Sequence, residues 1–297
     1  GSHLALSGIA QPTRWTTDTV GAGFIDLSAQ ASGAEKLTAI ARYQSLVAVF
    51  AERSIQVWSL DPNPDLNRLT QVLNNTGTAS PLSVTQFGDS DLFYLDESGL
   101  RSMRARDSSN AAATTDIGVP VDTLIAAKMR SMTDAERSNI IGLIEPRDGR
   151  FWLILKDVIY VFSYFSGAKI SAWTTYSPSD TAGVPFNVDA ACAFNKRVFV
   201  RSGNRVFAHG GAGGELMYDE TIADVWLPFL DAGSPTRAKN WQGVDAALEG
   251  EWDVYFGMEP NNAAAEDKIA VVFETSYSAP TIPSLGTSTH IKGHSKS

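Results

Sequence analysis

Hydrophobic and polar residues follow one another along this chain in a pattern that predicts repeated β-hairpins. In each copy, a run rich in β-branched and aromatic residues passes through a short polar turn into a second such run. The paired runs are 46–50 with 55–58, 92–95 with 100–103, 151–155 with 158–162, 198–200 with 205–208, and 252–256 with 269–273. Successive hairpins begin 46, 59, 47 and 54 residues apart, so the pattern indicates a structural unit that recurs.

Most of these hairpins have a further apolar run beside them. The additional runs lie at 37–40, 83–87, 140–144 and 188–193, before the first four hairpins, and at 169–175, after the third. A unit of a few short antiparallel strands at this period is typical of a propeller blade. Radial stacking covers the two apolar faces of each small sheet with its neighbours. We therefore predict an all-β fold, a β-propeller with short β-meander blades, over residues 4–280.

Residues 122–137 interrupt the strand pattern. Their apolar residues have helical spacing, and Thr133 and Glu136 stand at the spacing of a capping box. We expect one helical insertion here, as a single short helix or as two with a break near Ser131. The insertion either connects two blades or offers a contact surface to a neighbouring subunit. At the chain ends, we interpret residues 1–3 as a cloning scar and 281–297 as a flexible tail, truncated from a longer protein.

Composition and charge narrow the functional classes. The 297 residues are 43% hydrophobic, and 24 lysines and arginines stand against 33 acids, which gives a net charge of −9. Non-specific binding to nucleic acid needs cations that displace phosphate counterions, so this charge opposes that class of function. An acidic wall instead suits a surface along which DNA slides without being held. No apolar run reaches the length of about 18 residues that a membrane-spanning helix needs, and we expect no membrane span.

Six segments of the chain share the pattern of one known family. They are residues 45–58, 75–78, 99–112, 117–122, 161–165 and 169–173, within a region that covers most of positions 20–250. These segments resemble the packaged-DNA stabilisation proteins of short-tailed bacteriophages, the tail-nozzle family. The resemblance implies a structural protein of the virion tail, assembled in the cytoplasm of the host bacterium. It also implies that members have additional sequence before the region matched here.

The same resemblance implies a set of partners. Subunits of this family self-associate into a ring, expected to be hexameric, below the portal and adaptor rings. The ring retains packaged DNA and conducts it during ejection, so contact with DNA is transient. The portal-adaptor proteins and the tail needle or tip proteins are the expected neighbours.

Arg101, Arg104 and Arg106 alternate along a predicted strand and are followed by Asp107. Such a row is either a stripe that faces DNA phosphates or an array of ion pairs at a subunit interface. The acidic balance of the chain favours the subunit interface. These three arginines are the residues that we expect to contact another subunit or DNA.

An acidic cluster provides the alternative function. Asp89, Asp91, Asp96 and Glu97 lie on one predicted hairpin. Glycoside hydrolysis needs two carboxylates at a defined separation across a sugar. The alternative is therefore a phage-derived β-propeller glycan hydrolase or glycan-binding module. Solvated turn residues are the interpretation that we favour, and we predict that the protein is not an enzyme.

The remaining candidate sites each lack a necessary part. The loop 61–67 has the D-x-N-x-D spacing of a calcium site, but Leu66 and Val72 stand where that site needs Gly and Glu. The glycine-rich segment 209–214 has neither the esterase nor the phosphate-binding partner motif, and we interpret it as a loop between blades. Cys192, the single cysteine, is interpreted as a small core residue. We expect no catalytic residue, no metal and no cofactor.

Overall fold

The computed structural model describes residues 3–28, 35–109, 116–165, 170–180 and 182–210, and shorter segments at 224–227, 233–234, 239–240, 244–246, 251–257, 266–272, 277–279, 285–286 and 290–296. The chain divides into two compact units, Gly1–Ala212 and Gly213–Ser297. The division falls within the glycine-rich segment 209–214. The region predicted as one domain, residues 4–280, is therefore distributed over two units.

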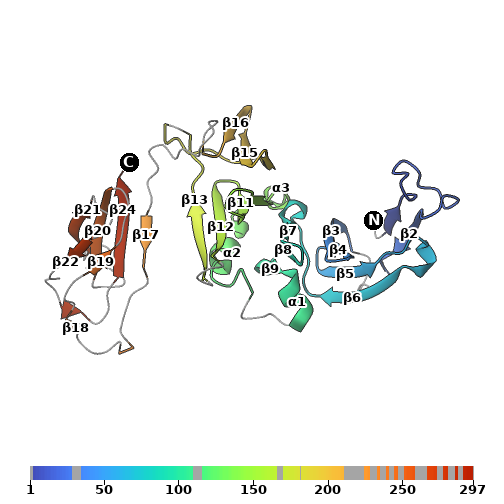
Figure 1. The fold of residues 1–297 in the computed structure, drawn as a ribbon, viewed down its shortest axis with the longest axis horizontal. Coiled ribbons are helices and arrows are strands. Elements are labelled where there is room, and N and C mark those ends of the chain that lie inside the picture. Colours follow the sequence, from blue (N-terminus) through green and yellow to red (C-terminus); the bar gives the residue numbers. More distant parts are fainter. Residues whose placement is uncertain are drawn as a thin grey trace. The chain divides into compact units, whose positions relative to one another are not determined.

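Unit 1 consists of small antiparallel sheets in which consecutive strands are neighbours (Figure 1). The first pair is β1 (His3–Leu6) and β2 (Gly23–Asp26). The next sheet contains β3 (Leu37–Tyr43), β4 (Leu46–Ala51), β5 (Ser54–Ser59) and β6 (Arg68–Asn74). It is followed by β7 (Thr85–Phe87), β8 (Asp91–Asp96) and β9 (Gly99–Ser102), then by β10 (Ile141–Glu145), β11 (Arg150–Leu155), β12 (Val158–Phe165) and β13 (Ile170–Tyr176), and last by β14 (Ala190–Phe194), β15 (Arg197–Ser202) and β16 (Arg205–Ala208).

The four hairpins predicted in this unit are confirmed as β4–β5, β8–β9, β11–β12 and β15–β16. The additional apolar runs are β3, β7, β10, β14 and β13. Tight turns make the short hairpins possible, and Lys156 adopts a φ of 60° where β11 turns into β12. The predicted all-β class is confirmed, because antiparallel sheets form most of the regular structure.

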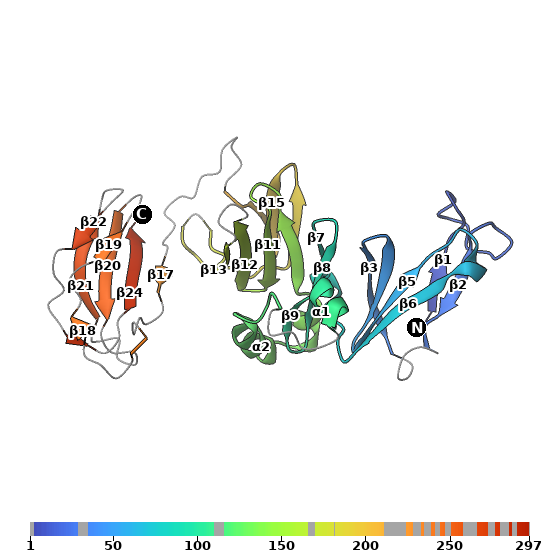
Figure 2. The same cartoon turned by 60° about the horizontal axis from the view of Figure 1, so that its bottom comes forward.

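The core of unit 1 lies between successive sheets, which follow one another from β1–β2 onward (Figure 2). Four apolar clusters each join one sheet to the next. Phe50 and Tyr94 meet in one cluster with ring centroids 5.3 Å apart, and Phe93 and Phe151 meet in another at 5.2 Å. The other two clusters contain Leu27 with Trp58, and Trp152 with Val198. Each inner sheet therefore buries apolar side chains on both faces, as sheets in a face-to-face stack must.

The first strands of successive sheets lie against one another. β3 contacts β7, β7 contacts β10, and β10 contacts β14. Gly142 of β10 allows one of these approaches, because a Cβ at that position would lie 2.3 Å from the Thr85 Oγ1 and 2.6 Å from the Ser83 carbonyl oxygen. The sheets therefore converge along the edge formed by their first strands.

Short helices interrupt the strands in the described part of the chain. α1 (Met103–Ser109) was not predicted, whereas α2 (Asp122–Arg130) and α3 (Asp134–Ser138) confirm an insertion with a break near Ser131. The expected capping box is present at the start of α3, where the side chain of Thr133 and that of Glu136 each accept from the other's backbone N–H. The 3-10 helices are η2 (Pro64–Leu66) and η3 (Pro81–Ser83). Within the described residues, the helices are all too short or too polar to cross a membrane.

Unit 2 contains short strands and the fifth predicted hairpin. β20 (Glu251–Gly257) pairs with β21 (Glu266–Val272), which confirms that hairpin, and also with β24 (His290–Lys296). The remaining strands are β17 (Asp224–Trp226), β18 (Lys239–Asn240), β19 (Val244–Ala246), β22 (Tyr277–Ala279) and β23 (Leu285–Gly286). β23 and β24 lie in the segment 281–297, which the sequence predicts as a flexible tail. The structure instead pairs β24 with β20 on one side and β17 on the other.

Candidate functional site

Arg101 is the centre of a buried ion-pair cluster at the end of β8–β9. Its Nη1 donates to the Asp122 Oδ2 at 2.6 Å and to the Leu100 carbonyl oxygen at 2.8 Å. Its Nε lies 3.6 Å from the Asp96 Oδ2, and the side chain of Arg101 is only 8% exposed. One cation thus joins β8, β9 and the start of α2, and charges removed from water in this way must be paired.

Asp116 joins the same cluster from the turn that precedes α2. Its Oδ1 accepts from the backbone N–H groups of Ser102 and Ile117, both at 2.9 Å. Its Oδ2 lies 3.9 Å from the Arg101 Nε and 3.3 Å from the Arg106 Nε. Burial raises the pKa of the Asp116 carboxyl, while the Ser102 N–H and the two guanidinium groups oppose that rise.

The prediction that Arg101, Arg104 and Arg106 alternate along one strand is wrong. β9 ends at Ser102, and Arg104 and Arg106 lie on α1. The cause is local capping, since the Ser102 Oγ accepts from the Ala105 N–H at 3.2 Å, and the Asp91 Oδ1 accepts from the Arg104 N–H at 3.0 Å. The side chain of Arg104 is exposed, whereas Arg101 and Arg106 form ion pairs within the chain.

The four acids of the β8 region have different surroundings. The Asp91 Oδ2 accepts from the Ser102 hydroxyl at 2.7 Å, which supports the cap of α1. The Asp96 Oδ1 accepts from the Ser98 N–H, the Ser98 hydroxyl and the Gly99 N–H, so this carboxylate organises the β8–β9 turn. Asp89 and Glu97 are exposed. The two cavities described below are lined by other residues.

The loop 61–67 is an Asx-rich turn. The Asp61 Oδ1 accepts from the Asn63 N–H at 2.8 Å, the Asn63 Oδ1 accepts from the Asp65 N–H at 3.2 Å, and the Asn67 Oδ1 accepts from the Asp61 N–H at 2.8 Å. Two of the three side chains with cation-binding spacing, Asp61 and Asn63, therefore accept hydrogen bonds from the loop's own backbone. In the described part of the chain, no group of three or more His, Cys, Asp and Glu side chains is placed to hold a metal ion.

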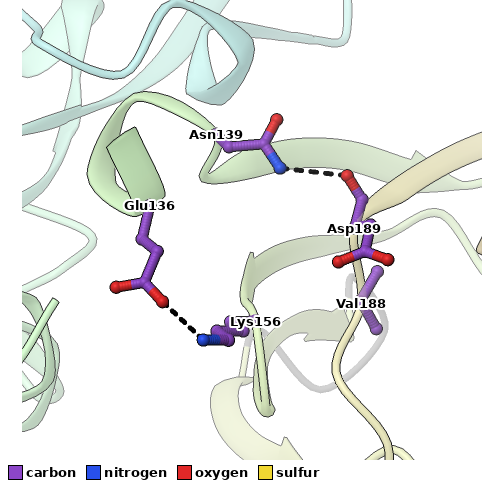
Figure 3. Close-up of a pocket in the computed structure, with 5 residues that line it drawn as sticks. All are labelled: Glu136, Asn139, Lys156, Val188 and Asp189. Carbon is purple, nitrogen blue, oxygen red and sulfur yellow. Dashed lines mark hydrogen bonds and ion pairs between the residues drawn. The ribbon is translucent and has the colours of Figure 1, made fainter. Parts of the chain in front are cut away.

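A polar cavity of about 190 Å³ lies between α3, the β11–β12 turn and the segment before β14. Figure 3 shows Glu136 paired with Lys156 on one side and the Asn139 amide bonded to the Asp189 carbonyl oxygen on the other. The Lys156 ammonium, followed by the hydrogen bonds from Thr133, lowers the pKa of Glu136 to about 2. The same pair raises the pKa of Lys156. These contacts join α3 to the sheet, and the polar groups in view are largely satisfied by one another.

Cys192 and His209 lie in and just after the β14–β16 sheet. Cys192 is exposed, so the prediction of a core residue is wrong. It lies on the face of β14 opposite Ala191, which packs into the core. His209 packs its ring against Trp152 at 4.7 Å between centroids, and burial lowers its pKa. Residues 211–214 of the predicted loop lie outside the described residues.

Sequence reasoning missed the connection between the β3–β6 and β7–β9 sheets. Four of its hydroxyl residues are buried: Thr76, Thr78, Ser80 and Ser83. The Ser83 hydroxyl donates to the Ser80 carbonyl oxygen at 2.7 Å and accepts from the Leu95 N–H at 3.1 Å. The Thr76 hydroxyl lies 2.7 Å from the Tyr94 hydroxyl, and burial raises the pKa of that tyrosine. In the sequence this polar segment has the composition of a surface loop. Its burial between two sheets becomes visible only in the structure.

Comparison with known proteins adds little. No protein-family model matches the chain, and no curated protein matches it. One solved structure, a chain of the S. cerevisiae complex of Dbp5 with Nup159, Gle1, IP6 and ADP, is 10% identical over 99% of this chain and 86% of that chain, with a TM-score of 0.30. A likeness at this level supports no argument about fold or function.

Proposed function

We propose that this protein is a structural subunit of a bacteriophage tail, and that its sheets are blades of a β-propeller. The observation that favours the propeller is the convergence of β3, β7, β10 and β14, the first strands of four successive meander sheets. Radial stacking brings the first strands of neighbouring blades together in this way, and each sheet covers the next.

The nozzle role rests on the segments that resemble the tail-nozzle family. In the structure several of them contact one another. Gly77 lies against the backbone of Ala51 and Glu52, where a Cβ would lie 2.3 Å from the Ala51 carbonyl oxygen. The Trp173 Nε1 donates to the Ile117 carbonyl oxygen at 3.0 Å. The shared residues therefore hold connecting segments against the sheets, as expected for a resemblance of architecture.

In this role the subunit forms a ring, expected to be hexameric, below the portal and adaptor rings of the virion. It neighbours the tail needle or tip proteins and contacts DNA transiently during ejection. The net charge of −9 suits a wall that does not hold DNA. Arg101 and Arg106 are paired within the chain, so Arg104 is the one of the three predicted arginines with an exposed side chain for contact with another subunit or with DNA.

The alternative, a glycan hydrolase or glycan-binding module, is less well supported. Asp91 accepts a hydrogen bond from Ser102, the cap of α1, and Asp96 accepts from Ser98 in the β8–β9 turn. Both carboxylates therefore already serve the local structure. A hydrolase would need two carboxylates about 5–10 Å apart across a sugar-sized cleft.

Electron microscopy of phage particles with gold-labelled antibodies against this chain tests the proposal. We expect label at the tail. We also expect class averages of the assembled protein to show closed propellers arranged in a ring of subunits. Label on the capsid, or particles without the protein, would overturn the tail assignment. Turnover of a glycan panel that Asp91→Asn abolishes would favour the hydrolase. Glu52→Gln, an exposed acid outside the cluster, is the control.

A further inference from the structure

The last sheet of unit 1 has one apolar face in solvent. Val198 and Val200 of β15 point into the core shared with β10–β13. Residues that alternate with them, and their partners on neighbouring strands, lie on the opposite face. We call this the β14–β16 outer face, and its members include Cys192, Phe194, Arg197, Phe199, Arg201 and Val206. Phe194 is 71% exposed and Val206 is 68% exposed.

This face does not have the character of a terminal repeat. Stacked repeats that end a structure have polar outer faces, because a large apolar patch promotes association. Here the exposed apolar side chains lie in a segment with an excess of positive charge. The segment 190–208 contains the cations Lys196, Arg197 and Arg201 and no acid. Its fourth cation, Arg205, is paired with Asp180 and lies over the Phe207 ring.

The opposite end of unit 1 has the complementary character. The N-terminal lobe, defined as residues 3–28 with the loop 60–67, exposes Ile9, Trp15, Val20 and Phe24 at 52%, 56%, 76% and 64%. A groove of about 330 Å³ in this lobe is lined mostly by apolar residues, including Trp15. The acid Asp61 also lines the groove. The lobe contains the acids Asp18, Asp26, Asp61 and Asp65 against a single arginine, Arg14.

We propose that the β14–β16 outer face of one copy docks on the N-terminal lobe of a second copy. Apolar side chains such as Phe194 and Val206 would be buried against Trp15 and the groove, while cations of the face would meet acids of the lobe. A symmetric contact between two outer faces would place like charges together, so opposite charge favours the head-to-tail arrangement. A contact of this kind uses two different surfaces on each copy and continues into a ring or a filament.

This inference names the surfaces through which subunits of the proposed tail ring contact one another. That the contacts close into a ring rests on the proposed function. The pairing itself depends only on the two surfaces.

Cys192 is a built-in reporter, because it is the single cysteine and lies on the outer face. We expect the full chain to self-associate in analytical ultracentrifugation and maleimide labelling of Cys192 to slow as protein concentration rises. Slow labelling at every concentration would mean that the chain's own residues cover the face. Rapid labelling at every concentration would mean that another surface mediates association. A chain that remains monomeric throughout would be equally incompatible with the proposal.

Two single variants test the head-to-tail geometry. Val206→Glu places an acid on the outer face, and Trp15→Ser removes the aromatic from the lobe; each should weaken self-association by about tenfold or more. An equimolar mixture should form dimers that grow no further, because each pair retains one intact contact. Leu124→Glu is the matched control, since Leu124 is 56% exposed on α2. No loss in either variant, or no dimer in the mixture, would overturn the pairing.

These outcomes are separable from the tail assignment. Association by these surfaces without label at a phage tail would leave the inference standing and remove the proposed function. Label at the tail with no association through these surfaces would do the reverse.

Discussion

At the scale of single residues, buried ion pairs in unit 1 hold neighbouring strands and helices together. Arg101 contacts carboxylates from β8, from the turn before α2 and from α2 itself. A buried cation of this kind cannot be removed without leaving acids unpaired in a poorly solvated place. The residue that the sequence offered as a surface contact is therefore a structural one.

Arg101→Met should destabilise the protein by about 3–5 kcal/mol, because Asp116 and Asp122 would lose their buried partner. Chemical denaturation monitored by circular dichroism measures the change. Arg104→Met is the control, since that side chain is exposed, and it should change stability by no more than about 0.5 kcal/mol. Equal effects of the two substitutions would contradict the assignment of Arg101 as the centre of a buried ion-pair cluster.

Glu136 makes stability depend on pH. Its pKa is about 2 in the folded protein against an ordinary 4.5, so the folded state favours the ionised form. The stabilising contribution is therefore complete above pH 4.5 and is lost as the pH falls from 4.5 toward 2. Glu136→Gln should lower the melting temperature near neutral pH, and the difference from the wild type should shrink through that acidic window.

The control for this experiment is Glu97→Gln, an exposed acid in the β8–β9 turn. It should give only a small difference in melting temperature at neutral pH. A difference between wild type and Glu136→Gln that stays constant across the acidic window would show that the ion pair with Lys156 is not its source.

At the scale of elements, the sheets are held by what lies between them. The apolar clusters lie between sheet faces, and the first strands of neighbouring sheets contact one another. The segment from Thr76 to Ser83, whose hydroxyl residues are buried, connects one sheet to the next. Close approach of backbone at such a junction leaves no room for a side chain. Gly142 of β10 is thus required by the packing of one sheet against the next, and not by the conformation of β10 itself.

Gly142→Ala should destabilise the protein by about 1–3 kcal/mol, because the new Cβ would collide with Thr85 and the Ser83 backbone. Thermal unfolding measures the loss. Gly88→Ala is the comparison, since Gly88 has open space around it and its φ of +64° costs only backbone strain, about 1 kcal/mol. An effect of Gly142→Ala no greater than that of Gly88→Ala would argue against tight contact between β7 and β10.

At the scale of the whole molecule, the balance of charge decides how the protein meets polyanions. The chain has 24 cations and 33 acids, and within unit 1 several cations are already paired with acids of the same chain. A surface of this kind releases few phosphate counterions, so it gains little from contact with DNA. Passage of DNA past such a protein would be rapid and without strong attachment.

Fluorescence anisotropy with a labelled duplex tests this directly. We expect no binding at micromolar protein at about 0.15 M salt, and only weak binding at low salt. Tight binding with a steep dependence on salt concentration would contradict the expectation, and its loss in Arg104→Met would identify the contact.

The sequence by itself determined the strands and much of their pairing. Runs rich in β-branched and aromatic residues, joined by short polar turns, located β4–β5, β8–β9, β11–β12, β15–β16 and β20–β21. The capping box at Thr133 located α3 for a similarly local reason, since cap and helix are neighbours in the chain. Such signals lie within a few residues of the element that they specify.

Only the tertiary structure decided the roles of Arg101, Cys192 and the segment from Thr76 to Ser83. Arg101 meets Asp116 and Asp122, and Cys192 faces away from the core although its neighbour Ala191 faces into it. The acids that pair with an arginine, and the face that a sheet leaves uncovered, depend on residues distant in the chain. A pattern within one segment does not contain that information, because burial is a property of what packs against the segment.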